Sequence, residues 1–179
     1  MKDFDPSLYI EVNTFNISFF VREKDSNNNF IISYRLDIPL AGVENNIITN
    51  YEKFFNLIKE NVYLIEQKSK HIFKETILIL ENFDPIFLNL AGFKKLNGSQ
   101  ILRENITYIL NTLKTYVINI EKDKTILHIF NSNFNLDKKK IYNLPIGLFG
   151  NFYSQELSLI MIDKNNYKNL KNVFDKCNL

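Results

Sequence analysis

The order in which the apolar periodicity changes along the chain restricts the fold more than any other feature. Short apolar-rich runs occupy residues 8–12 and 17–21, and residues 30–38 place every second apolar side chain on one face. This alternation predicts three β-strands. Residues 51–70 then change to helical spacing, and the continuous apolar run at 76–80 is typical of a strand buried on both faces. The sequence therefore predicts a β-β-β-α-β unit.

A second unit is predicted after the break at Asn82-Phe83-Asp84-Pro85, where turn-forming residues interrupt the pattern. Asn50 and Ser99 precede the two longest helical patterns, and each is the residue type that caps a helix. The expected elements of this unit are a strand, a helix and two strands, at 86–96, 99–120, 125–136 and 152–163, and a final helix is expected after it at 165–176. The fold class is α/β in the broad sense, a mixed α+β chain, and its first part has the order of half a ribonuclease-H-like or actin-like domain, although other α/β folds share that order.

Composition excludes several classes of function. Hydrophobic residues make up 45% of the chain, with 16 Phe and 9 Tyr, which is ample for a core. The net charge is only +2 and forms no basic stripe, so we expect no nucleic-acid partner. Residues Met1–Asp5 do not begin a signal peptide, and no apolar stretch approaches the roughly 20 residues that span a bilayer. A cytoplasmic location is therefore expected.

Histidine and cysteine are too sparse to predict metal or thiol chemistry. His71 and His128 are far apart and neither has a second ligand at the usual spacing, so no metal site is predicted. His128 lies in an apolar strand pattern and is expected to be packed or hydrogen-bonded. Cys177 is the single cysteine and is expected to be a packed thiol in a reducing compartment. No catalytic residue is predicted.

The polar tip between the first two strands is the first candidate site. Asn13, Thr14 and Asn16 occupy a turn at which backbone N–H groups and a hydroxyl could bind phosphate. Such turns usually contain Gly because the backbone must approach the phosphate closely, and Asn13 stands where that Gly is expected. An ordinary hairpin turn without a ligand is the equally weighted alternative.

The segment Tyr142–Gly150 is the second candidate, because it is an apolar loop between two strands. Such a loop either packs back on its own domain or forms a contact surface, and local packing is favoured because large exposed apolar patches are uncommon. Leu144, Pro145 and Leu148 would be the partner-binding residues of the contact surface. The preceding charged run Asp137–Lys140 is expected to be a solvated turn, with contact to acidic lipid or an acidic partner as the alternative.

Three motifs follow one another in the second unit: Ile126-Leu127-His128-Ile129, then Phe134-Asn135-Leu136-Asp137, then Pro145-Ile146-Gly147-Leu148-Phe149-Gly150. In order and spacing they resemble one segment of the bacterial cell-division family FtsA. Upstream, Glu11-Val12-Asn13-Thr14 is similar to the family's Glu/Asp-Ile-Gly-Thr/Ser turn, and Leu90-Ala91-Gly92 is similar to its small-Gly turn. Asn13 in place of Gly and the absence of a Ser-Gly after Glu81-Asn82 depart from the family pattern.

The resemblance implies an N-terminal fragment of an actin-like scaffold. Residues 1–82 would be part of an actin-like subdomain, 83–163 an inserted strand–helix–strand–strand module, and 164–179 a helix returning to the subdomain. It further implies self-association, contact with FtsZ and later division proteins, and ATP as a ligand of the complete protein only. It places that protein on the cytoplasmic face of the inner membrane at the septum, held by a C-terminal helix outside these residues. An actin-like ATP-binding half-domain and a related pilus-assembly scaffold are the alternatives.

Overall fold

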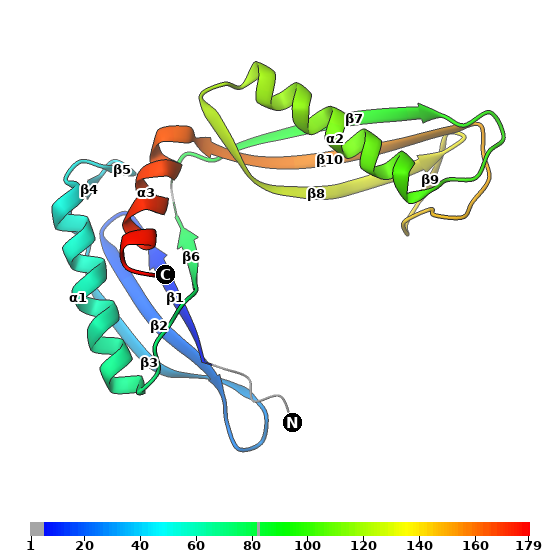
Figure 1. The fold of residues 1–179 in the computed structure, drawn as a ribbon. Helices are drawn as coiled ribbons and strands as arrows, with labels where there is room; N and C mark the ends of the chain where they lie inside the picture. The colour runs from blue at the N-terminus through cyan, green and yellow to red at the C-terminus, as the bar shows by residue number, and fades with distance from the viewer. Residues whose placement is uncertain (1–5, 82) are drawn as a thin grey trace. The chain divides into compact units, whose positions relative to one another are not determined.

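The computed structural model describes residues 6–81 and 83–179 and divides into two compact units (Figure 1). Unit 1 comprises the chain up to Asp84 together with Asn165–Leu179, and unit 2 comprises Pro85–Lys164. The expectations for Met1–Asp5 and for Asn82 lie outside the described residues. The fold is mixed α+β, as the periodicities predict.

Unit 1 is a four-stranded sheet in the order β3-β2-β1-β6. β1 pairs antiparallel with β2 and parallel with β6, so that Ile10 lies between Phe19 and Leu78. A short hairpin, β4 and β5, connects β3 to the long helix. The elements are β1 (Ser7–Val12), β2 (Asn16–Lys24), β3 (Phe30–Pro39), β4 (Val43–Glu44), β5 (Ile47–Ile48), α1 (Tyr51–Ser69), β6 (Thr76–Leu80) and α3 (Lys164–Lys176).

The core of unit 1 lies on one face of this sheet. Alternate residues of β1 and β2 are fully buried, and the apolar stripes of α1 and α3 pack on them. The Asn50 side chain caps α1 by accepting a hydrogen bond from Lys53 N–H at 3.0 Å, which confirms the predicted cap. The buried cluster is Leu8, Ile10, Val12, Ile17, Phe19, Val21, Phe54, Ile58, Val62, Ile65, Phe73, Phe83, Leu170, Val173 and Phe174.

Unit 2 is a second four-stranded sheet, in the order β7-β10-β8-β9, with α2 on one face (Figure 1). β10 is the central strand and pairs antiparallel with β7 and with β8. Two bulges in β8 shift its register against β10. The elements are β7 (Ile86–Lys95), α2 (Arg103–Ile120), β8 (Lys124–Leu136), β9 (Lys139–Ile141) and β10 (Phe152–Asp163).

The contact between α2 and its sheet depends on Gly92. This glycine lies in the interior of β7, where a Cβ atom would be 2.5 Å from Ile109 Cγ2 and 3.1 Å from Leu113 Cδ1. The expected small-Gly turn at Leu90-Ala91-Gly92 is therefore wrong, because these residues continue an unbroken strand. The small residue is needed for close approach of the helix and not for a turn.

Two further local expectations are wrong. Ser99 does not cap α2, because the chain stays extended through Ile101, whose N–H donates to Leu148 O at 2.8 Å. The helix instead begins after Leu102, whose N–H donates to the Asn105 side chain at 2.8 Å. The strand β6 is not buried on both faces within the described residues, since Ile77 is 47% and Ile79 is 37% exposed.

No helix among the described residues combines the length and the apolar character that crossing a bilayer requires.

Candidate functional site

The hairpin turn between β1 and β2 is closed by the side chain of Asn13. Its Oδ1 accepts hydrogen bonds from Phe15 N–H at 3.1 Å and from Asn16 N–H at 2.7 Å. Asn13 N–H donates to Asn16 O at 3.1 Å, which completes an Asx-type turn. Asn13 does not adopt a positive φ, so the turn does not require glycine at this position.

This geometry decides what the turn can bind. In a phosphate-binding turn the backbone N–H groups point at the ligand and remain unsatisfied without it. Here the side-chain carbonyl of Asn13 already occupies two of those N–H groups, and a phosphate would have to displace it. Thr14 and Asn16 lie on the same turn and are exposed. The structure therefore brings the three predicted residues together in one turn, in which the N–H groups of Phe15 and Asn16 donate to the side chain of Asn13.

A hollow in unit 1 lies at the opposite end of β1. It has a volume of about 500 Å³ and is lined by Pro6–Leu8 and His71–Ile77. It thus lies beside the start of β1 and not beside the hairpin turn.

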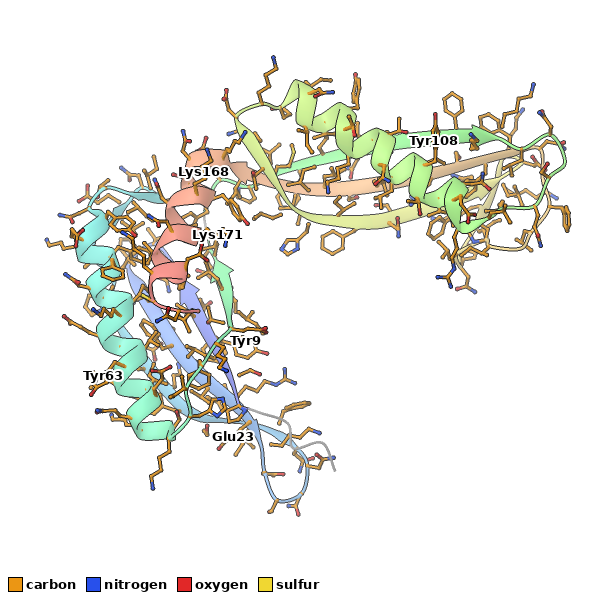
Figure 2. The ribbon with its side chains drawn as sticks, in the orientation of Figure 1. Tyr9, Glu23, Tyr63, Tyr108, Lys168 and Lys171 are labelled. Carbon is orange, nitrogen blue, oxygen red and sulfur yellow. The ribbon has the colours of Figure 1, made fainter. Side chains whose placement is uncertain are left out.

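The outer face of the unit 1 sheet carries a polar and aromatic cluster that sequence analysis missed. Tyr9 of β1 stacks on Phe20 at a centroid distance of 5.0 Å (Figure 2 labels Tyr9). Arg22 donates to Tyr9 Oη at 3.0 Å and lies 3.6 Å from the centre of the Phe30 ring. The sequence contained a signal for this cluster, namely the alternation of buried and exposed residues in the two strands. In β1 the odd-numbered residues point away from the core, and in β2 the even-numbered residues do so.

A charged group continues the same face toward β3. Asp37 pairs with Arg35 at 2.9 Å and accepts a hydrogen bond from Ser18 at 2.5 Å. The Arg35 hydrogen bond, and then that of Ser18, hold the pKa of Asp37 below its ordinary value. Neither α1 nor α3 covers this face, because both pack into the core on the other side. With Ile77 and Ile79 of β6, the face offers a partner aromatic, aliphatic and charged contacts together.

The apolar loop of unit 2 is exposed at most of its side chains. Leu144 and Leu148 are exposed, whereas Pro145 is buried. The favoured expectation was that the loop packs on its own domain. It is wrong for Leu144 and Leu148 and is confirmed for Pro145. The physical reason is that the loop uses its backbone to hold the neighbouring segment, which leaves its side chains directed outward.

The histidines and the cysteine form no reactive arrangement. Among the described residues no group of three or more His, Cys, Asp or Glu side chains could hold a metal ion. His128 is exposed, with its ring 5.9 Å from that of Phe130, so the expectation of a packed side chain is wrong. Burial raises the pKa of the Cys177 thiol, which keeps it protonated and a poor nucleophile.

Comparisons with known proteins show the fold alone. No protein-family model matches the chain. No curated protein matches its sequence. Among solved structures, a chain of the PilM–PilN type IV pilus biogenesis complex is similar with a TM-score of 0.60 and 6% sequence identity. The similarity covers 97% of this chain and 45% of that chain, so this chain spans less than half of its neighbour. This chain thus shares the mixed α+β, actin-like fold of the matched part of that chain.

Proposed function

We propose that this protein is a non-catalytic, actin-like scaffold that acts through protein–protein contacts, of the kind used in pilus assembly. The observation that carries the proposal is the 97% coverage of the chain in the comparison with the PilM–PilN complex, since that coverage includes both units. The neighbour is itself a complex of two proteins, which supports a partner-binding role. The uncovered outer face of the unit 1 sheet is consistent with such a role.

A cell-division scaffold of the FtsA type is the second candidate. Its support is the sequence resemblance along residues 126–150, and nothing in the comparison with the pilus complex favours FtsZ or self-association. In either case we propose a cytoplasmic protein that works at the inner face of the inner membrane.

The two candidates differ in their partner, and this difference gives the test. The purified chain would be titrated by calorimetry with the PilN-type protein and, separately, with FtsZ from the same organism. We expect saturable binding of the PilN-type protein at roughly micromolar affinity, the range of many transient contacts. Binding of FtsZ alone would transfer support to the cell-division scaffold, and binding of neither would refute the partner assignment.

The non-catalytic part of the proposal rests on the hairpin turn. Because Asn13 already satisfies the N–H groups of Phe15 and Asn16, we expect no saturable binding of a fluorescent ATP analogue. Asn13→Gly frees both N–H groups and is the matched comparison, in which any binding should rise relative to the wild type. Tight binding by the wild-type chain would overturn the proposal and favour an ATP-binding half-domain.

A further inference from the structure

The far end of unit 2, opposite the end where the chain enters and leaves this unit, exposes a group of large apolar side chains. Tyr142 is 87% and Phe149 is 70% exposed, and Leu144, Ile146 and Leu148 of the same loop are also exposed. We define the apolar tip as Leu102, Tyr142, Leu144, Ile146, Leu148 and Phe149. Exposed apolar groups of this size on one site mark a contact surface.

The backbone of the tip is held in place by the segment that precedes α2. Ile101 N–H donates to Leu148 O at 2.8 Å, and Gly147 N–H donates to Ile101 O at 2.9 Å. Gln100 Nε2 donates to Gly147 O at 2.8 Å, and its backbone forms a bridge with Phe149. These bonds fix the loop while its side chains point outward. The exposure therefore belongs to a defined surface.

Beneath the tip, two small or rigid residues anchor the loop in the unit. Pro145 and Gly150 are buried, and a Cβ atom at Gly150 would come within 2.3 Å of Leu136 Cδ1. Asp137 accepts hydrogen bonds from Asn151 N–H at 2.9 Å and from Phe152 N–H at 2.8 Å. The carboxylate that precedes the loop, that of Asp137, is thus engaged with the backbone, whereas Glu104 lies in the first turn of α2 beside Leu102.

Positive charge is concentrated around the same end of the unit. Residues 94–104 and 136–152 contain six cations against two carboxylates, a net charge of +4, whereas the whole chain has a net charge of +2. Lys140 lies 5.9 Å from the centre of the Tyr142 ring, which joins the basic and aromatic groups directly. In Figure 1, β9 and the loop lie beside the N-terminal end of α2, where Arg103 starts the helix. The cations are Lys94, Lys95, Arg103, Lys138, Lys139 and Lys140.

We propose that this tip docks on an anionic lipid bilayer. Its Phe, Leu, Ile and Tyr side chains enter the boundary between head groups and acyl chains, and the surrounding lysines contact the acidic head groups. Five of the six cations are lysines. The long side chain of a lysine can reach the charged head groups while the apolar residues of the tip are inserted below them. The charge complementarity selects an anionic membrane over a neutral one.

This inference differs from the sequence-based expectation that membrane contact would come only through a C-terminal helix. It also goes beyond the proposed scaffold role, because it assigns a lipid contact to unit 2 itself. Its test contains no second protein, so its failure would leave the binding of a PilN-type partner unaffected.

The first experiment measures co-flotation of the full chain with vesicles. We expect binding to vesicles that contain phosphatidylglycerol as a minor component and none to pure phosphatidylcholine. Lys139→Glu with Lys140→Glu should weaken binding by at least about tenfold, given about fivefold for each cation removed at a charged membrane. The matched control, Lys114→Glu with Lys122→Glu, changes two exposed lysines of unit 2 away from the tip. Equal weakening by both pairs, or no vesicle binding by the wild type, would overturn the proposal.

The second experiment reports insertion directly. The chain contains no tryptophan, so Phe149→Trp provides a single fluorescent reporter at the tip. We expect a blue shift of its emission with anionic vesicles only. Ile118→Trp on α2 is the control, because Ile118 is also exposed but lies outside the tip. A shift at residue 118 without one at residue 149 would contradict the proposed docking surface. Circular dichroism of each variant verifies that it is folded.

Discussion

Gly92→Ala gives the sharpest test of how unit 2 is packed. The added methyl would lie 2.5 Å from Ile109 Cγ2, about 1 Å closer than carbon atoms prefer. Ile109 is only 2% exposed and has little room to move. Overpacking of this kind costs about 1–3 kcal/mol. Replacing a glycine also reduces the entropy of the unfolded chain, which returns about 0.4–1 kcal/mol. The clash is the larger effect, so we expect a net destabilisation of about 1–2 kcal/mol.

The assay must isolate unit 2, because the two units of the chain need not unfold together. Amide hydrogen exchange of residues 103–120 in increasing urea reports the stability of α2 on its sheet. We expect faster exchange there in Gly92→Ala, with little change in residues 51–69 of unit 1. The dependence of this exchange on urea concentration provides the corresponding free energy of unfolding of unit 2.

A double-mutant cycle separates the clash from other causes. Ile109→Ala alone removes a buried side chain and should cost about 2–5 kcal/mol. In the double variant the methyl group introduced at position 92 occupies part of the space that Ile109 leaves, so we expect the two costs to be less than additive by about 1 kcal/mol or more. Gly98→Ala is the control, since it has a φ of +82° and nothing within 4 Å of its Cβ position. The free-energy cost of Gly98→Ala should therefore add to that of Ile109→Ala without an interaction energy. If Gly92→Ala is as stable as the wild type, the close approach of α2 to β7 is incorrect.

Three further predictions concern local features. Tyr153 is buried, and burial raises the pKa of its hydroxyl from 10.0 to about 12. The stability that the protonated hydroxyl confers is complete below about pH 10 and is lost as the pH rises to about 12, so Tyr153→Phe should reduce the pH dependence of urea unfolding in this range by an amount on the order of 1 kcal/mol, and an unchanged profile would contradict this. Asn50→Ala should lower stability by about 1 kcal/mol in urea unfolding, whereas Ser99→Ala should change it by less than about 0.5 kcal/mol because Ser99 is not a cap. Iodoacetamide should alkylate Cys177 more slowly in the folded chain than in guanidinium at about pH 8, and equal rates by mass spectrometry would show that burial does not protect the thiol.

Periodicity predicted the long elements well because each has one buried face that the sequence repeats many times. It failed where two or three residues form an element. The β4–β5 hairpin turns at Asn45 and Asn46, which both have positive φ, yet each strand is too short to show an alternation. β9 was expected to be a loop because its residues are Lys139, Lys140 and Ile141. It forms because its backbone pairs with Phe134–Leu136, a partner that no local pattern reveals.

The sequence was sufficient to locate the candidate sites. It was not sufficient to predict their hydrogen bonding or their exposure to solvent. The sequence placed Asn13, Thr14 and Asn16 on one turn, but only the geometry shows that the side-chain carbonyl of Asn13 occupies the turn's own N–H groups. It singled out the apolar loop around Leu148, but whether that loop is buried depends on the contacts of Ile101 and Gln100, which are distant in sequence.

The apolar run of β6 predicts more burial than the described residues of this chain provide. Apolar residues on both faces of a strand are selected by burial on both faces. Leu78 and Leu80 pack against the core of unit 1, whereas Ile77 and Ile79 remain open on the outer face beside the Tyr9–Phe20 pair. Under the scaffold role proposed above, a partner bound on this face would account for the pattern, because both isoleucines would then be buried in the complex. Ile79→Lys should in that case weaken partner binding without destabilising the free chain, since the side chain is already partly exposed, and a loss of stability without a loss of binding would refute this explanation.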